Sequence, residues 1–225
     1  MSEHVDVGIK PYFDRDGVTL YHGDCLDILP RLGVCADVSF CDPPWGVKKA
    51  TWDETFDIRI VEACASATRS VMAVTPGISN LLSLPRAISG MLYRWSLSIR
   101  IMNSRMRGAL GFGNWIACPL YARGDASVYT CAQDCTDIVI RGHMPNHADP
   151  KPIDAMRWIL ARLPTGTVLD PTAGSGTTLL AAREAGRKAI GIEIDEQHCE
   201  TAAVRLGATP RRPADDGPLF GGLAR

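Results

Sequence analysis

The sequence predicts an α/β protein built on a doubly wound, mostly parallel sheet. Short apolar segments of strand length alternate with segments of helical periodicity in both halves of the 225-residue chain. In the second half, a glycine-rich turn at residues 174–176 stands between a predicted strand and a predicted helix. With 46% apolar residues, the chain can bury a sizeable core. We therefore expect a single domain over residues 1–206, with ligands bound at the carboxyl ends of its strands.

The first half of the chain predicts an alternation of strands with short helices. The strand segments alternate apolar and polar residues or are continuously apolar, and a turn or a proline follows each of them. Strands are expected at residues 18–23, 36–41 and 70–75, and helices at residues 26–32 and 58–68. Two later strands are expected at residues 99–102 and 114–122, with the glycine-rich residues 108–113 between them as a turn.

The second half repeats this alternation more clearly. A helix is expected over residues 151–163, because apolar residues recur at helical spacing from Ile153 to Leu163 and Pro164 stops the pattern. A strand at residues 167–170, a helix at 177–185, a strand at 188–194 and a helix at 196–206 complete a βαβ unit with its following helix. Residues 207–225 are rich in Pro, Gly and charge, which predicts a flexible tail.

The overall charge excludes few classes of partner, because the formal net charge is only -1. This balance requires neither a polyanionic partner nor a membrane surface. The first eight residues lack the apolar core of a signal peptide, and no apolar run approaches the ~20 residues that span a bilayer. We expect a cytoplasmic protein that does not interact with membranes.

The eight cysteines show no spacing typical of a secreted disulfide framework, so they are expected to be reduced. Cys131 and Cys135, together with His143 and His147, have the chemistry of zinc ligands. The C-x3-C spacing is loose for such a site, and His147 has a different explanation below. The pattern favours a loop that contains cysteines, and no metal is expected.

The segment LDPTAGSGTT predicts a nucleotide-like ligand. Gly174 and Gly176 allow a tight turn and let a ligand approach the backbone at the start of a helix. Glu193 closes the next strand 23 residues after Asp170, an offset at which an acid can accept hydrogen bonds from both hydroxyls of a ribose. The third glycine of a dinucleotide site is absent, and a negative Asp170 suits a cationic sulfonium better than a pyrophosphate. The loop therefore favours S-adenosylmethionine as the ligand. The alternative is that the loop binds no ligand and that its glycines serve only packing.

The corner DPPW, residues 42–45, predicts a site for an exocyclic amino group. Pro43 restricts Asp42 to an extended conformation, and both prolines fix their own φ. The Asp42 carboxylate and the Pro43 carbonyl can accept the two hydrogens of an amino nitrogen and aim its lone pair at a methyl donor. Trp45 can stack on a base that has left its duplex. The alternative is a proline-rich turn with a core tryptophan.

DPPW followed much later by DPTAGSGTT and GIEID resembles the amino-directed DNA methyltransferases, in the permuted order where the catalytic half precedes the cofactor half. The resemblance implies a circularly permuted, Rossmann-like class I methyltransferase fold with S-adenosylmethionine as cofactor. Within TLYHGDCLDILP it places Asp24 near the cofactor adenine. HADPKP, residues 147–152, looks like a degenerate H-P-T-x-K-P segment, which places Lys151 near the methionine end of the cofactor; Ala148 and Asp149 depart from the family pattern.

The resemblance also implies the composition of the site. The catalytic residues are expected to be Asp42, Pro43, Pro44 and Trp45. The cofactor-binding residues are expected to be Asp24, Asp42, Lys151, Asp170, Thr172, Gly174, Ser175, Gly176, Thr177 and Glu193.

The expected reaction is methylation of adenine N6 in DNA, because cytosine-N4 members of the family usually carry Ser where Asp42 stands. In Trp45 the chain replaces the commoner Tyr and keeps the stacking face. The alternatives are a cytosine-N4 enzyme, an RNA or protein amide methyltransferase and, from a different class, an NAD-dependent oxidoreductase. The last leaves the Asp-Pro-Pro-Trp corner unexplained.

Residues 63–124 contain seven arginines and no Asp or Glu, which predicts a surface for double-stranded DNA. We expect residues 78–146 to form a small basic insertion that contacts the DNA. The candidate contacts are Lys48, Lys49, Arg94, Arg100, Arg105 and Arg107. A homodimer is a further hypothesis, and PLFGG near the C-terminus faintly resembles peptides that dock on bacterial sliding clamps.

Overall fold

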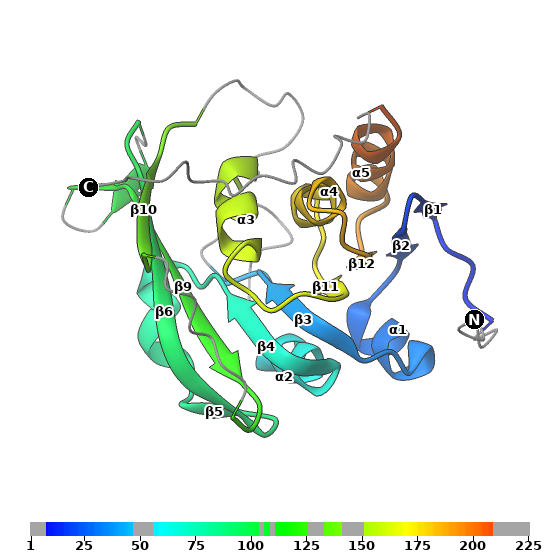
Figure 1. Cartoon of the computed structure of the whole chain (residues 1–225), viewed down its shortest axis with the longest axis horizontal. Coiled ribbons are helices and arrows are strands. Elements are labelled where there is room, and N and C mark those ends of the chain that lie inside the picture. Colours follow the sequence, from blue (N-terminus) through cyan, green and yellow to red (C-terminus); the bar gives the residue numbers. More distant parts are fainter. Residues whose placement is uncertain are drawn as a thin grey trace, which may run out of the picture.

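The protein is built around one large sheet with helices on both faces (Figure 1). This computed structural model describes residues 8–46, 56–103, 106–108, 111–125, 133–140 and 151–208. The strands follow the order β1-β2-β12-β11-β3-β4-β9-β6-β10, and β5 pairs with β6 beside this path. The predicted α/β architecture is confirmed.

The strands and helices have the following bounds. The large sheet contains β1 (Phe13–Arg15), β2 (Val18–His22), β3 (Ala36–Cys41), β4 (Thr68–Val74), β5 (Ala87–Ile88), β6 (Met91–Ile101), β9 (Trp115–Ala122), β10 (Cys135–Ile138), β11 (Val168–Asp170) and β12 (Ala189–Glu193). A separate pair of strands is formed by β7 (Met106–Gly108) and β8 (Gly111–Gly113). The helices are α1 (Cys25–Leu32), α2 (Ile58–Ser66), the 3-10 helix η1 (Ile78–Ser83), α3 (Ile153–Leu160), α4 (Thr177–Glu184) and α5 (Glu196–Ala208).

The central strands β2, β12, β11, β3 and β4 run parallel to one another. On one side β9 pairs antiparallel with β4, and β6 pairs antiparallel with β9, while on the other side β1 is antiparallel to β2. Parallel strands bring their carboxyl ends to the same edge of a sheet. The residues that follow these five ends therefore come together: Gly23 and Asp24 after β2, Asp42 after β3, Thr75 after β4, Pro171 after β11 and Ile194 after β12.

The helices cover the two faces of the sheet as two groups, as Figure 1 shows. On one face α3 packs on α4 and α4 packs on α5, and Ile159, Leu179 and Cys199 from these helices belong to the largest buried cluster. On the other face α1 packs on α2, where Ile28 contributes to a second cluster with Leu169 of the sheet. This double covering explains why β3, β4 and β12 each contain at least three consecutive buried residues.

The predicted elements agree with the structure where their sequence pattern is local and strong. The strand at residues 36–41 has the predicted bounds, and α1, α2 and α4 lie within two residues of theirs. The main difference is β6, which begins at Met91 instead of residue 99. Leu92 to Trp95 are all exposed, so this part of the strand lacks the alternation that predicts a half-buried strand.

Other differences are smaller. The glycine-rich residues 108–113, expected as a turn, include the last residue of β7 and all of its partner strand β8. The helix expected over residues 151–163 is shorter, and α5 continues two residues beyond 206. β6, β9 and β10 of the expected insertion at residues 78–146 extend the main sheet, while the domain boundaries themselves stay a prediction. Residues 209–225 of the expected tail lie outside the described residues.

Candidate functional site

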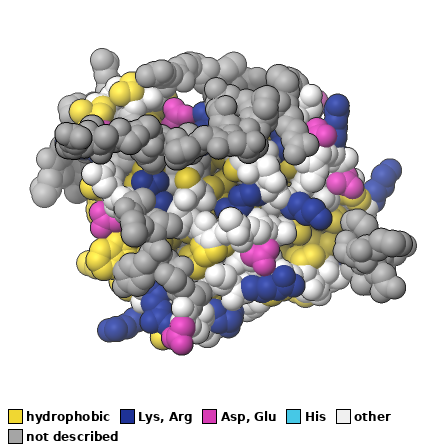
Figure 2. Space-filling model, in the orientation of Figure 1, with side chains coloured by type: hydrophobic (Ala, Val, Ile, Leu, Met, Phe, Trp, Pro, Cys, Tyr) yellow, Lys and Arg dark blue, Asp and Glu magenta, His cyan; other side chains and the backbone are white. Residues whose placement is uncertain are grey.

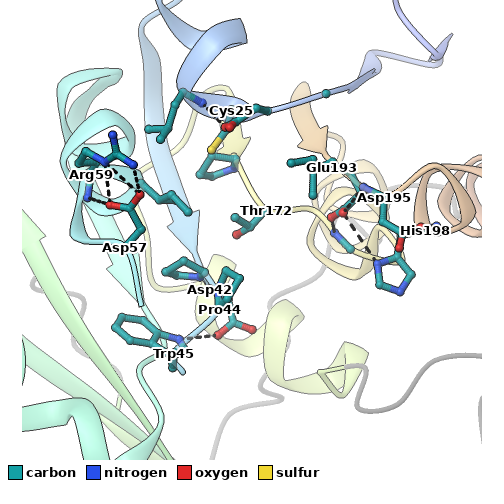
Figure 3. A pocket seen from close by; sticks show the side chains of 18 of the residues that line it. Cys25, Asp42, Pro44, Trp45, Asp57, Arg59, Thr172, Glu193, Asp195 and His198 are labelled. Carbon is teal, nitrogen blue, oxygen red and sulfur yellow. Dashed lines mark hydrogen bonds and ion pairs between the residues drawn. The ribbon is translucent and has the colours of Figure 1, made fainter. Parts of the chain in front are cut away.

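A cavity of about 530 Å³ lies along the edge where the parallel strands end. Asp42, Pro43, Pro44 and Trp45 line one part of it, and Glu193, Asp195 and His198 line another. Thr172 lies between these two groups in Figure 3, with Cys25 farther along the cavity. The expected amino-group corner and the expected ribose acid are therefore brought to one cavity, although 151 positions separate Asp42 from Glu193 in the sequence.

Asp42 follows β3 directly, and three side chains hold its carboxylate. Thr75 Oγ1 donates to Oδ1 at 2.9 Å, and Trp45 Nε1 donates to the same oxygen at 3.3 Å. Lys151 Nζ lies 2.5 Å from Oδ2 and forms an ion pair with it. The Asp42 side chain remains 22% exposed, so its carboxylate is anchored and yet reachable from the cavity.

Trp45 forms the wall of the cavity beside Asp42. Its ring stacks on Phe56, with ring centroids 4.6 Å apart and an interplanar angle of 21°. Its backbone carbonyl accepts a hydrogen bond of 2.7 Å from Asn80 Nδ2. Only 7% of Trp45 is exposed. The indole is therefore fixed by stacking on one face and by its N–H bond to the acid.

Glu193 ends β12 and is nearly buried, yet its carboxylate lines the cavity. Oε2 accepts from the backbone N–H of Gly174 at 2.6 Å, and Oε1 accepts from the backbone N–H of Asp195 at 2.9 Å. His198 Nδ1 lies 3.8 Å from Oε1, and its hydrogen bonding to Glu193 raises the pKa of His198. A carboxylate oxygen can accept about two hydrogen bonds, so Oε2 keeps capacity for a ligand hydroxyl, whereas Oε1 is shared by the Asp195 N–H and His198.

The glycine loop divides into a cavity side and a helix side. Thr172 and Gly174 line the cavity. Ser175 and Thr177 turn to α5 instead, where Arg205 Nη1 donates to the Ser175 carbonyl at 2.5 Å and to Thr177 Oγ1 at 3.1 Å. Gly176 has a φ of +75°, and a Cβ there would lie 2.9 Å from Ala202 Cβ of α5.

Comparisons with known proteins show what the chain is similar to. A family model described as DNA methylase, N6_N4_Mtase, matches residues 130–204. The Type II methyltransferase M.ScaI of Streptomyces caespitosus is 24% identical over 263 aligned residues, which cover 88% of this chain and 84% of that protein. These matches support the resemblance to the amino-directed DNA methyltransferases that the sequence motifs indicate.

Two further comparisons describe the extent of the likeness. A protein described as a methylase, YubD of Escherichia coli (strain K12), is 40% identical over 68 residues, which are 29% of this chain and 30% of that protein. The crystal structure of an M1.HpyAVI–SAM complex superposes with a TM-score of 0.70 at 19% identity, covering 84% of this chain and 100% of that one. At this identity the structural likeness establishes the fold alone.

Asp24 and Asp170, the remaining acids expected in this family site, have different surroundings. Asp24 lines the cavity and caps α1, because its Oδ1 accepts from the Leu26 N–H at 2.8 Å. Asp170 is only 3% exposed and is not among the residues that line the cavity. Burial raises the pKa of Asp170 to about 7, with smaller raising contributions from Asp42 and Glu193. The full negative charge that the sequence argument assigned to Asp170 is therefore conditional on pH.

Several cavity residues were missed by the sequence analysis. Asp57, which caps α2, binds the Arg59 guanidinium through both carboxylate oxygens, and both residues line the cavity. Cys25 also lines it, and burial raises the pKa of this thiol to about 12, which keeps it protonated. Their places in the sequence could have identified two of these residues. Cys25 follows the turn after β2, and Asp57 precedes a helix as its N-cap residue.

The expected DNA contacts lie away from this cavity or outside the described residues. Arg94 donates to the Gly124 carbonyl, and Arg100 forms an ion pair of 2.5 Å with Asp137. Lys48, Lys49 and Arg105 lie outside the described residues, and of Arg107 only the backbone is described. Figure 2 shows Lys and Arg spread over one face of the molecule, with apolar areas between them.

Two further expectations concern a zinc site and membrane association. Cys131, His143 and His147 lie outside the described residues, and the described residues contain no group of three or more potential metal ligands. Among the helices that the structure describes, none combines the length and apolar character needed to cross a membrane.

Proposed function

We propose that this chain transfers a methyl group from S-adenosylmethionine to N6 of adenine in double-stranded DNA, after the base has left the duplex. One observation carries the proposal: the carboxylates of Asp42 and Glu193 line the same cavity, at the carboxyl ends of two strands from the parallel centre of one sheet. Glu193 suits the ribose of a nucleoside cofactor, and Asp42 suits an amino group brought against that cofactor.

The cavity fits S-adenosylmethionine in size and in chemistry. Its volume of about 530 Å³ falls within the range of small-ligand sites. Glu193 Oε2 retains acceptor capacity for a ribose hydroxyl, and Leu26 and Ile194 add apolar surface beside Asp24 for a purine. Thr172 and Gly174 would border the chain between the ribose and the reacting end. When bound, the cofactor supplies an electrophilic methyl group on a positively charged sulfur.

The Asp-Pro-Pro-Trp corner would prepare the amino nitrogen. Delocalisation of its lone pair into the base makes an exocyclic amine a poor nucleophile. The Asp42 carboxylate and the Pro43 carbonyl would accept its two hydrogens, which holds the nitrogen closer to tetrahedral and directs the lone pair. The methylated nitrogen then needs only to lose one proton.

Trp45 would hold the plane of the base. Phe56 already covers one face of the indole, so the base would stack on the other face, as the outermost member of a three-ring stack. Because Trp45 is only 7% exposed, entry of the base would require neighbouring side chains to move. The indole N–H bond to Asp42 would keep the stacking face and the acceptor in a fixed relation.

Cytosine N4 is the second candidate acceptor, because the family contains enzymes for both amino groups. Asp42 supports adenine, since Ser is the usual residue at this position in cytosine-N4 members. The remaining alternatives, RNA or a protein amide, lose support because the arginine-rich residues 63–124 suit a duplex polyanion and the family acts on DNA.

The test is a methyl-transfer assay with labelled S-adenosylmethionine over duplex DNA, RNA and protein, followed by digestion of the DNA and mass spectrometry of the nucleosides. We expect N6-methyldeoxyadenosine. Detection of N4-methyldeoxycytidine instead would show that cytosine, and not adenine, is the target base. Label found only in RNA or protein would refute the DNA substrate.

Two variants separate the proposed roles. Asp42→Ala should abolish transfer while S-adenosylhomocysteine still binds. Glu193→Ala should weaken S-adenosylhomocysteine binding by about tenfold or more, because the ribose loses a buried acceptor. Full activity of Asp42→Ala, or unchanged affinity of Glu193→Ala, would remove the role assigned to that residue.

A further inference from the structure

The two oxygens of the Asp42 carboxylate differ in what they can still accept. Oδ1 receives two donors, the Thr75 hydroxyl at 2.9 Å and the Trp45 indole N–H at 3.3 Å. A carboxylate oxygen offers about two lone-pair positions, so Oδ1 has no place for a third donor. An amino hydrogen that binds Asp42 must therefore approach Oδ2, the oxygen to which Lys151 Nζ is bound at 2.5 Å.

Lys151 is placed to serve more than one partner. It lies two residues before α3, on a backbone separate from the corner, and its side chain is 30% exposed. It lines the cavity together with Asp42, Thr172 and Gly174. A lysine carries its charge on a flexible stem of four carbons, and a partly buried ammonium needs an anionic or polar partner wherever it rests.

We propose that Lys151 is a positioning residue that exchanges its partner when the cofactor binds, an inference that rests on the proposed function. Without cofactor, Lys151 occupies Oδ2 of Asp42. With cofactor, the ammonium of Lys151 moves to the α-carboxylate at the methionine end. Oδ2, which has one acceptor position left beside Lys151, then offers both positions to the amino group of the target base. Cofactor binding thereby prepares the acceptor for the base.

Charge balance favours this exchange. A half-buried carboxylate that loses its ammonium partner would ordinarily be destabilised. Here the positively charged sulfur of the cofactor would compensate Asp42, while the cofactor carboxylate compensates Lys151. Each charge keeps a partner of opposite sign in both states, so the exchange leaves no buried charge unpaired.

The exchange has a thermodynamic consequence for cofactor binding. Breaking the ion pair between Lys151 and Asp42 offsets part of the free energy that Lys151 contributes to binding the cofactor carboxylate. Removing the charge of Asp42 should therefore strengthen the binding of a ligand that has the carboxylate but lacks the sulfonium. S-adenosylhomocysteine is such a ligand, because its sulfur is neutral and gains nothing from the Asp42 charge.

The experiment is titration calorimetry of S-adenosylhomocysteine with wild type, Asp42→Asn, Lys151→Met and the double variant. Asn is isosteric with Asp and keeps an oxygen for Thr75 and Trp45. We expect Asp42→Asn to bind roughly threefold to tenfold more tightly than wild type, and Lys151→Met to bind about tenfold more weakly. In the Lys151→Met background, Asp42→Asn should have no effect, because the competing partner is already absent.

Asp137→Asn is the matched control, since Asp137 is also bound to a basic side chain, Arg100, and is not among the residues that line the cavity. It removes the same charge and should leave the affinity unchanged. Lys151→Gln provides a second loss of the ammonium if Lys151→Met does not fold.

The proposal is overturned if Asp42→Asn binds S-adenosylhomocysteine no more tightly than wild type, or if it tightens binding equally with and without Lys151. Failure of the proposed function would look different, because wild type itself would then neither methylate DNA nor bind S-adenosylhomocysteine.

Discussion

The Thr75 hydroxyl donates a hydrogen bond of 2.9 Å to Oδ1 of Asp42 and so joins the ends of two neighbouring strands. Cys41 of β3 pairs with Val74 of β4, and the Thr75 N–H donates to the Cys41 carbonyl at 3.1 Å. Asp42 and Thr75 therefore leave the sheet side by side. Because Thr75 is only 2% exposed, its hydroxyl has little access to competing water. Sheet register, more than the proline corner alone, thus fixes the direction of the Asp42 carboxylate.

Thr75→Val should lower the rate of methyl transfer while leaving cofactor affinity nearly unchanged. Valine fills the same volume, but Oδ1 loses its shorter donor and the carboxylate can rotate away from the amino group. A loss of about tenfold in kcat corresponds to roughly 1.4 kcal/mol of transition-state stabilisation. Single-turnover assays and calorimetry with S-adenosylhomocysteine measure the two quantities. Thr75→Ser keeps the hydroxyl and should restore most of the rate; equal losses in both variants would show that packing, and not the hydrogen bond, is responsible.

Arg100 and Asp137 provide a matched pair for testing the proposed DNA surface. Their ion pair of 2.5 Å is about half exposed on both sides, so a phosphate can compete with Asp137 for Arg100. Arg100→Gln should weaken DNA binding several-fold and reduce the slope of log affinity against log salt by about one. Asp137→Asn should strengthen binding, because it releases Arg100. Fluorescence anisotropy over a range of salt concentrations measures the DNA affinity of both variants. If neither affinity differs from that of wild type, the DNA does not bind along β6 and β10.

The site was predictable from the sequence where its signals are local. Asp42 to Trp45 follow a six-residue strand with clear bounds, and Glu193 ends another, so their place at one edge follows from the parallel sheet. Thr75 and Lys151 could not be assigned to Asp42 in this way. They lie 33 and 109 positions from it, and these contacts depend on sheet register and on the path of the chain before α3.

The glycine loop shows a different limit of sequence reasoning. The motif alone does not indicate which side of the loop each residue faces. Gly174 lines the cavity, whereas Gly176 packs against Ala202 and Ser175 accepts from Arg205. The partners on α5 follow the loop by more than 25 positions, so only the packing of α4 on α5 separates the two roles.

Asp170 should make the stability of the protein fall as pH rises. Its pKa is about 7 in the folded protein and close to 3.8 when unfolded. Between these values the folded carboxyl keeps a proton that the unfolded chain has released, so increasing pH favours unfolding. Relative to Asp170→Asn, wild type should lose roughly 2–3 kcal/mol of unfolding free energy between pH 5 and pH 8. Urea unfolding of both proteins across this range measures the difference, and parallel pH profiles would show that Asp170 is ionised throughout.

Gly176→Ala should destabilise the protein because of both its backbone conformation and its contact with α5. The φ of +75° is unfavourable for alanine, and the new Cβ would lie 2.9 Å from Ala202 Cβ and 3.4 Å from Ala202 Cα. We expect a loss of about 2–4 kcal/mol in urea unfolding, from strain and overpacking together.

Gly186→Ala separates these two contributions. Gly186 has a similar φ of +70°, but a Cβ there would meet nothing within 4 Å, so this variant should show the backbone cost of about 1 kcal/mol alone. Combining Gly176→Ala with Ala202→Gly removes the overlapping methyl group and should recover part of the difference between the two glycine variants. If Gly176→Ala costs no more than Gly186→Ala, α5 can shift to accept the methyl group, and close packing of α4 on α5 is not the reason for glycine at position 176.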